Sequence, residues 1–242
     1  MSDSLQLQQW TLLQPLLKHA LEFSAFQRSR LLPVYRNIHS LESFAREAPL
    51  THKSELAADQ MAHPRYGSNQ TAPTEQYQRF CQTSGTTSRP LAIWDTNESW
   101  NWLLENWLKG YALAEVHSGM TAFFAFSFGP FLGFWTAFEA GLKLGLRCLP
   151  GGGLGTAARL HAILEHRVEV LCCTPTYALH LAEAAGRTGI DLSKSSVRKI
   201  LLAGEPGGSL PSVRAQLATA WPAADILDHY GMTEVGPVAF AA

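Results

Sequence analysis

Apolar residues recur at helical spacing in the first sixty residues of the chain. The longest such pattern covers residues 5–22 and has Pro15 inside it. Shorter helical patterns follow at residues 40–46 and 53–61. Residues 62–76, by contrast, are rich in Pro, Gly, Ser, Asn and Thr, which is typical of an exposed connector. The sequence therefore predicts a helical N-terminal part that ends in an irregular segment.

A different pattern begins after residue 81. A helix is predicted over residues 98–114, and beyond it short runs that are apolar on both faces alternate with helical segments. Strands of that kind are typical of a mostly parallel sheet with helices on both sides, so we expect a layered α/β fold. The predicted strands are 121–126, 145–149, 168–173, 198–203 and 224–228, and the predicted helices are 131–144, 156–166, 176–187 and 209–220.

The composition narrows the class of protein. The chain has 242 residues, of which 46% are hydrophobic and 16% charged, so it can bury a sizeable core. A net charge of −1 offers no basic face for nucleic acid or an anionic membrane. The four cysteines lack metal-ligand spacing, and the N-terminus lacks a secretory pattern, so we expect free thiols and a cytoplasmic location.

One uncharged stretch, residues 118–138, is long enough to cross a bilayer. Gly129 and Pro130 stand near its middle and would break a helix there. A buried strand, a turn and a buried helix explain the same residues, and we favour that interpretation over a membrane span.

The segment from Thr83 to Pro90 is the first along the chain whose residue types suggest a ligand-binding site. Five hydroxyl side chains surround Gly85 between Thr83 and Ser88, so a loop there can point amides and hydroxyls at one anion. A surface turn without function would look similar. The segment is not a Walker A loop, because the Gly-Lys-Ser/Thr ending is missing.

A second polar segment runs from Asp228 to Glu234, about 140 residues later. Tyr230 offers a ring for adenine, Thr233 a hydroxyl for an α-phosphate, and Glu234 an oxygen ligand for Mg²⁺. The two segments together predict two halves of one ATP site.

Two glycine-rich segments and a pair of histidines are less specific. Residues 201–208 follow a predicted strand, and their glycines allow close approach to a flat ring, although an ordinary strand-to-helix turn looks the same. Residues 151–155 do not complete a dinucleotide-binding pattern, because Thr156 stands where the third glycine belongs. His161 and His166 are five residues apart and are interpreted as surface histidines.

Taken together, these segments resemble the adenylate-forming superfamily, and within it the branch similar to phenylacetate-CoA ligases. Residues 83–87 look like that family's phosphate loop, residues 203–206 like its adenine-stacking turn, and residues 230–234 like its adenine and magnesium motif. The segments at 49–53 and 127–130 also look like this branch, so the resemblance spans nearly the whole chain.

The resemblance implies roles for individual residues. It implies Thr86, Thr233 and Glu234 as catalytic residues, with Glu234 and Thr86 as ligands of Mg²⁺. The implied acyl pocket suits an aromatic or otherwise apolar acid and is lined by Phe126, Phe128, Phe131 and Tyr177. The implied nucleotide-binding residues are Thr83, Ser84, Gly85, Thr86, Thr87, Ser88, Gly204, Glu205, Pro206, Asp228, His229, Tyr230, Gly231, Met232 and Thr233.

Two positions depart from the family pattern. Ser88 stands where the family usually has Gly, at a cost of roughly 1 kcal/mol if the position needs positive φ. Leu91 stands where many members have Lys, which leaves Arg89 as a substitute cation near the pyrophosphate.

The resemblance also implies a domain organisation. Residues 1–78 are expected to form an N-terminal helical appendage packed on the core, and residues 79–242 an incomplete nucleotide-binding α/β core. The C-terminal domain with its catalytic lysine is expected beyond Ala242, so the chain looks like the N-terminal part of a longer enzyme.

The implied activity is ATP-dependent activation of a carboxylic acid as an acyl-adenylate, with transfer to coenzyme A and release of AMP and pyrophosphate. Transfer to an amine or a carrier protein is one alternative, and a nucleotide-binding remnant without turnover is another. The implied partners are the acid, ATP and coenzyme A, and the oligomeric state, a homodimer included, stays open.

Overall fold

The computed structural model describes residues 3–83 and 89–241. The chain divides into two compact units, Met1–Thr96 and Asn97–Ala242. The domain boundary that the sequence suggests after residue 78 stays a prediction.

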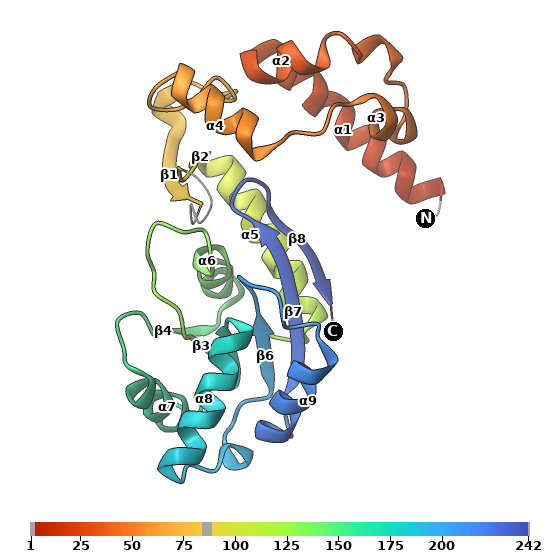
Figure 1. Cartoon of the computed structure of the whole chain (residues 1–242). Coiled ribbons are helices and arrows are strands. Elements are labelled where there is room, and N and C mark those ends of the chain that lie inside the picture. The colour runs from red at the N-terminus through yellow and green to blue at the C-terminus, as the bar shows by residue number, and fades with distance from the viewer. Residues whose placement is uncertain (1–2, 84–88, 242) are drawn as a thin grey trace. The chain divides into compact units, whose positions relative to one another are not determined.

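The first unit is a group of helices followed by a β-hairpin (Figure 1). The long helix α1 contains Pro15 and packs on α2 and α3 through a small core around Leu17, Leu31 and Ile38. The predicted helices over 5–22, 40–46 and 53–61 are confirmed. The elements are α1 (Asp3–Phe23), α2 (Ala25–Leu31), η1 (Tyr35–Asn37), α3 (Leu41–Glu47), α4 (Lys53–Ala62), η2 (Thr74–Gln76), β1 (Tyr77–Gln82) and β2 (Ala92–Thr96).

The hairpin holds the two ends of the hydroxyl-rich loop together. Strands β1 and β2 pair in antiparallel fashion, and Cys81 lies opposite Ile93. Just beyond the strands, the Thr83 amide donates to the Leu91 carbonyl over 3.1 Å, and the Leu91 amide donates to Thr83 Oγ1 over 2.9 Å. Residues 84–88 themselves lie outside the described part of the chain.

The second unit is built on a six-stranded sheet in the order β4-β3-β5-β6-β7-β8. All neighbouring pairs are parallel except β7 with β8. The strands are β3 (Thr121–Phe124), β4 (Arg147–Pro150), β5 (Val170–Cys173), β6 (Lys199–Leu202), β7 (Asp225–Met232) and β8 (Gly236–Ala241), and the helices are α5 (Asn97–Leu113), α6 (Trp135–Leu144), α7 (Thr156–Glu165), α8 (Pro175–Thr188), η3 (Leu192–Lys194) and α9 (Pro211–Ala220).

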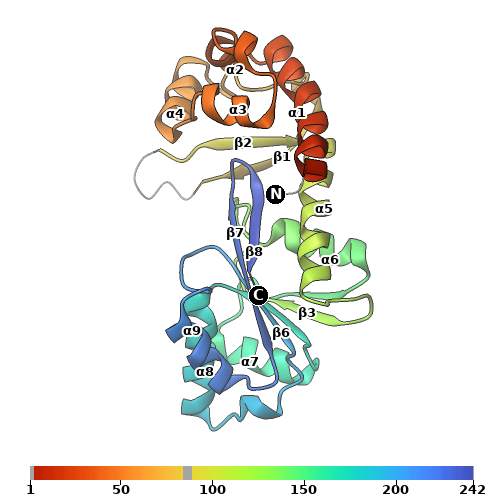
Figure 2. The ribbon, with the colours of Figure 1, turned by 90° about the vertical axis from the view of Figure 1, so that its right-hand side faces the viewer.

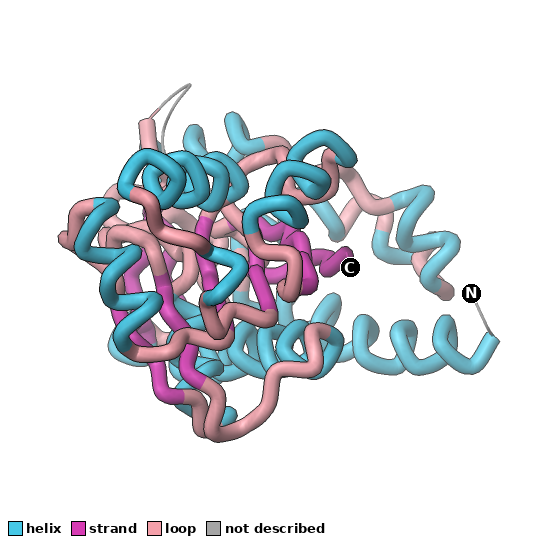
Figure 3. Tube along the Cα trace, turned by 90° about the horizontal axis from the view of Figure 1, so that it is seen from below, coloured by secondary structure: helices cyan, strands magenta, loops and turns pink. Residues whose placement is uncertain are grey.

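Helices cover both faces of this sheet. Figure 2 shows α7, α8 and α9 on one side of it and α5 and α6 on the other, and Figure 3 shows the strands between two layers of helices. Every residue of β3 and of β5 is buried, which explains why both strands are apolar on both faces. The layered α/β fold that the sequence predicts is therefore confirmed.

The uncharged stretch 118–138 belongs to the core of the second unit. It forms β3, an irregular segment and the first turn of α6, as the favoured interpretation expects. Within the described ranges, no helix has the length and apolar character needed to cross a membrane.

The sequence analysis missed the last strand, β8. This strand contains Pro237, and it lies at the edge of the sheet, where a proline is tolerated. Its Phe240 packs against the backbone of Gly110 in α5, where a Cβ atom would lie 2.4 Å from the ring.

Candidate active site

The candidate site of the second unit is the carboxyl edge of its sheet, meaning the side on which β5, β6 and β7 end. Cys173, Leu202 and Asp228 lie opposite one another in neighbouring strands. The segments 174–177 and 203–208 therefore begin beside each other and beside Asp228, whose strand β7 continues to Met232. Ligands of open α/β sheets bind at this edge.

The turn at residues 203–208 lies directly against the end of β7. Gly204 and Gly207 have φ angles of 94° and 141°, which favour glycine. A Cβ atom on Gly208 would lie 2.2 Å from Asp228 Oδ1, and Ser209 Oγ donates to Asp228 Oδ2 over 2.6 Å. The structure thus places the segment just after the predicted adenine turn against Asp228, which lies two residues before the predicted adenine and magnesium motif.

The predicted adenine and magnesium motif, residues 230–234, occupies the end of β7 and the turn into β8. The Tyr230 side chain is 59% exposed, so a face of its ring is open to a ligand. Gly231 has no room for a side chain, since its Cβ atom would lie 2.8 Å from the Gly236 carbonyl oxygen. Thr233 and Glu234 are half-buried in the turn that follows.

His229 stands out by its environment. Its ring lies 4.5 Å from the Trp107 ring and 5.0 Å from the Phe240 ring, measured between centroids. Neither ring nitrogen has a hydrogen-bond partner in the described part of the chain. Burial lowers the pKa of His229 from 6.5 to about 4, against the opposing charge of Asp228. The imidazole is therefore neutral at pH 7.

Glu205, in the adenine turn, points its carboxylate at the first turn of α8. It accepts hydrogen bonds from the backbone amide and the hydroxyl of Thr176. Burial opposes its charge, but the hydrogen bonds from Thr176 and Thr174 outweigh burial and hold the pKa of Glu205 below its usual value.

Two of the four predicted acyl-pocket residues come together. The rings of Phe126 and Phe128 lie 4.8 Å apart between centroids, and Phe128 also packs on Trp135 at 4.8 Å. Phe131 is 39% exposed. Tyr177 packs against the guanidinium of Arg159, which lies 4.8 Å from its ring centroid.

The predicted phosphate loop belongs to the first unit. Thr83 is buried, and its hydroxyl accepts from the Leu91 amide at the base of the loop. Leu91 is 1% exposed, so this position is part of the apolar interior. Arg89 is exposed and lines, with Arg65, a cavity of about 120 Å³.

The predicted joint site of the two motifs needs residues from both units. Ser84, Gly85, Thr86, Thr87 and Ser88 lie outside the described residues. The loop and the Tyr230 motif also belong to different units. Their convergence on one ATP stays a prediction.

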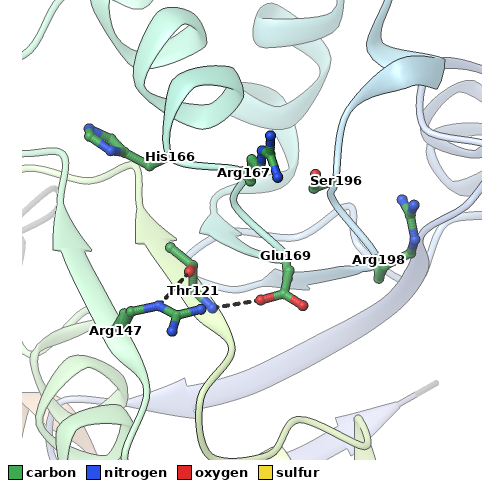
Figure 4. A pocket seen from close by; sticks show the side chains of 7 residues that line it. All are labelled: Thr121, Arg147, His166, Arg167, Glu169, Ser196 and Arg198. Atoms are coloured by element: carbon green, nitrogen blue, oxygen red, sulfur yellow. Dashed lines mark hydrogen bonds between the residues drawn. The ribbon is translucent and has the colours of Figure 1, made fainter.

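A different cavity, of about 530 Å³, lies at the opposite, amino edge of the sheet, where strands β3 to β6 begin (Figure 4). It is lined by Thr121, Arg147, His166, Arg167, Glu169, Ser196 and Arg198.

The polar groups of this second cavity are engaged with one another and with the backbone. Arg147 Nε donates to Thr121 Oγ1 over 3.0 Å, and the Thr121 amide donates to Glu169 Oε2 over 3.0 Å (Figure 4). Arg198 Nη1 donates to two carbonyls, at Ser195 and Val197. Arg147 and Arg198 therefore stabilise the local structure, and the carboxylate of Glu169 lies among the arginines of this cavity.

Mg²⁺ usually takes one or two protein carboxylates together with substrate phosphates. The residues that the structure describes hold no group of three or more His, Cys, Asp or Glu side chains that could bind a metal alone. The role of Glu234 as a ligand of a metal ion that arrives with a nucleotide stays a prediction.

Sequence reasoning missed Arg159. It is a buried arginine whose Nε donates to the Gly151 carbonyl over 2.9 Å and whose Nη1 donates to the Ala125 carbonyl over 3.3 Å. Its only sequence signal is a charge on the otherwise apolar face of α7. His161 and His166, in and just after that helix, are exposed, as predicted.

Comparison with known proteins agrees with the resemblance found in the sequence. Four phenylacetate-coenzyme A ligases match, three of which illustrate the range. The one from Thermus thermophilus is 30% identical over 134 residues, 55% of this chain and 30% of that protein. The one from Pseudomonas putida is 26% identical over 241 residues, 97% of this chain and 52% of that protein. The one from Escherichia coli is 27% identical over 247 residues, 97% of this chain and 53% of that protein.

Solved structures match over most of the chain. A 2-hydroxyisobutyryl-CoA ligase, in complex with 2-HIB-AMP and CoA, superposes with a TM-score of 0.86 and 26% identity over 91% of this chain and 47% of that chain. The chain thus spans about half the length of the relatives whose matches cover nearly all of it. The pattern of the AMP-binding enzyme family matches residues 27–242. The chain therefore belongs to the AMP-binding enzyme family.

Proposed function

We propose that this chain is the ATP-binding part of an AMP-forming ligase that joins a carboxylic acid to coenzyme A. The observation that carries the proposal is the carboxyl edge, where Gly208 and Ser209, at the end of the turn 203–208, contact Asp228, two residues before Tyr230. Support comes from relatives that are phenylacetate-coenzyme A ligases and from a structural neighbour that binds an acyl-AMP and CoA.

In the first half-reaction, a carboxylate oxygen of the acid attacks the α-phosphorus of ATP. The bond from that phosphorus to the bridging oxygen breaks, and pyrophosphate leaves with the electron pair. Such a displacement depends on positioning and on neutralising charge. We assign the β- and γ-phosphates to residues 83–88, with Arg89 as an additional cation, and the α-phosphate to the Thr233 hydroxyl.

The adenine ring is assigned to the space between the turn 203–206 and the exposed face of Tyr230. Glycines in that turn let the backbone approach a flat ring closely. Glu234, with Thr86, would hold Mg²⁺, which when bound neutralises charge on the phosphate oxygens.

In the second half-reaction, the thiolate of coenzyme A attacks the acyl carbon of the adenylate. AMP leaves, a thioester remains, and the thiol proton passes to solvent. The acid is assigned to a pocket near Phe126 and Phe128, whose edge-to-face rings suit an aromatic or apolar group.

The test is acid-dependent exchange of labelled pyrophosphate into ATP by the full-length protein, screened against aryl and alkyl acids. We expect exchange with at least one apolar acid, and thioester formation when coenzyme A is added. Absence of exchange with every acid would contradict the proposal, while exchange without thioester formation would remove coenzyme A as the acceptor.

A further inference from the structure

The register of the sheet places two segments of the carboxyl edge in contact. Cys173 at the end of β5 lies opposite Leu202 at the end of β6. Thr176 and Glu205 each follow three residues later, so the first turn of α8 meets the adenine turn at equivalent positions.

Glu205 closes this contact with its side chain. Its Oε1 accepts from the Thr176 backbone amide over 2.7 Å, and it also accepts from the Thr176 hydroxyl. Helix α8 begins at Pro175, and Thr174 caps the next free amide, that of Tyr177, over 3.3 Å. A carboxylate at a helix N-terminus is stabilised by the free amides and by the helix dipole. Glu205 therefore links the first turn of α8 to the adenine turn through hydrogen bonds.

Tyr177 is the next residue along this turn, and it is held on two further sides. Its hydroxyl donates to Thr156 Oγ1 over 3.3 Å, at the start of α7. One face of its ring carries the Arg159 guanidinium at 4.8 Å. Arg159 in turn binds the carbonyls of Gly151 and Ala125, at the ends of β4 and β3. The position of the Tyr177 ring therefore depends on the ends of β3 and β4, which hold Arg159, and on the segments that follow β5 and β6.

We propose that Glu205 is a positioning residue that couples the adenine site to the acid pocket. Through Thr176 it fixes Tyr177, so that movement of the adenine turn on nucleotide binding is transmitted to the pocket wall. This inference rests on the proposed function, because it takes the turn 203–206 as the adenine site and Tyr177 as a wall of the acid pocket.

If Glu205 only capped helix α8, it would make the same hydrogen bonds to Thr176 but would not couple the adenine site to the acid pocket. Loss of a simple cap lowers stability and impairs all substrates alike. Loss of the coupling changes the response of Tyr177 to nucleotide and impairs the acid more than ATP. These outcomes can be separated.

The test that needs no turnover uses the full-length protein labelled with fluorotyrosine and followed by ¹⁹F NMR. Tyr177→Phe identifies the Tyr177 signal among the six tyrosines of the chain. We expect AMP to shift this signal in the wild-type protein and to leave it unmoved in Glu205→Ala. An equal shift in both proteins, or none in the wild type, would overturn the coupling.

The kinetic test compares the KM for the acid with the KM for ATP. For Glu205→Ala we expect the acid KM to rise about tenfold or more, and the ATP KM to rise by a clearly smaller factor, since Glu205 itself belongs to the adenine turn. Glu205→Gln, which keeps an acceptor oxygen, should recover part of the loss. Glu183→Ala is the matched control, because Glu183 is exposed on the same helix and pairs only with Arg187 among the described residues.

The two tests separate two kinds of failure. If the wild-type protein activates no acid, the proposed function fails, and the NMR result still decides whether Glu205 links the two segments. If acid activation occurs but both KM values rise equally in Glu205→Ala, the proposed function stands and the positioning role is wrong.

Discussion

The two edges of the six-stranded sheet differ in how they use polar groups. At the carboxyl edge, glycines at 207, 208 and 231 lie in close contact with neighbouring atoms, Gly204 has a positive φ, and Tyr230 stays exposed. At the amino edge, arginines line a cavity of about 530 Å³ but bind a neighbouring hydroxyl and backbone carbonyls (Figure 4).

Under the proposed function, the nucleotide binds at the carboxyl edge and not in the cavity of the amino edge. Helices of this fold run antiparallel to the strands, so their C-termini, with partial negative charge, lie at the amino edge and favour cations there. Their N-termini lie at the carboxyl edge and favour anions such as phosphates. Substitutions at the carboxyl edge should therefore affect nucleotide chemistry, and substitutions at the amino edge should not.

The largest effect is expected for Glu234→Gln at the carboxyl edge. Loss of the carboxylate removes the proposed ligand of the metal that accompanies the nucleotide, so pyrophosphate exchange should fall about 100-fold or more. Radiolabel exchange at saturating acid measures this. Glu183→Gln, on the exposed face of α8, is the control and should keep wild-type exchange. Undiminished exchange in Glu234→Gln would refute the metal role.

The lowered pKa of His229 makes the free energy of unfolding depend on pH. Its pKa is about 4 in the folded chain, whereas the ordinary value for histidine is 6.5, so the unfolded chain binds the proton first as pH falls. The folded state should therefore keep full stability above pH 6.5 and lose roughly 3 kcal/mol as pH falls to about 4.

Urea titrations at several pH values measure this loss. In His229→Phe the fall in the free energy of unfolding between pH 6.5 and pH 4 should be smaller by that amount, because the ring packed on Trp107 and Phe240 no longer titrates. Parallel pH profiles for the two proteins would show that His229 is not the group responsible.

Gly208→Ala should push the adenine turn away from β7. The new Cβ atom would lie 2.2 Å from Asp228 Oδ1, so the free energy of unfolding should drop by about 1–3 kcal/mol. Gly186→Ala is the matched control. Gly186 lies within α8 with no atom within 4 Å of its added Cβ, so alanine there should stabilise by about 0.5–1 kcal/mol. Equal effects at both positions would mean that the turn does not pack as described.

The smallest effect is expected at the amino edge. Arg147→Gln and Arg167→Gln should leave pyrophosphate exchange within about twofold of wild type. Arg167→Gln should also leave the free energy of unfolding within about 0.5 kcal/mol, since its side chain is exposed. Exchange assays and urea titrations measure both. A large loss of exchange in either variant would erase the contrast between the two edges.

The fold was predictable because its core strands are short and apolar on both faces. Residues 170–173 illustrate this, since β5 is buried throughout and carries no charge. The hairpin β1–β2 was missed because its strands are only half-buried and mix polar with apolar residues. Local patterns cannot reveal a strand whose support comes from distant partners.

The candidate site was predictable only in part for the same reason. Tyr230 and Glu234 belong to a contiguous motif and could be named from the sequence. Arg159 and Thr176 act through contacts with residues 8 to 34 positions away, which follow from the sheet register and not from the local sequence. The sequence therefore named groups for ATP but not the contacts that position them.

The most direct test of the central claim is a crystal structure of the full-length protein with a non-hydrolysable ATP analogue and Mg²⁺. We predict the phosphates within hydrogen-bond distance of the Thr86 hydroxyl, the adenine beside Tyr230, and the metal about 2.1 Å from a Glu234 oxygen. A nucleotide seated instead among the arginines of the amino edge, or a metal remote from Glu234, would contradict the account.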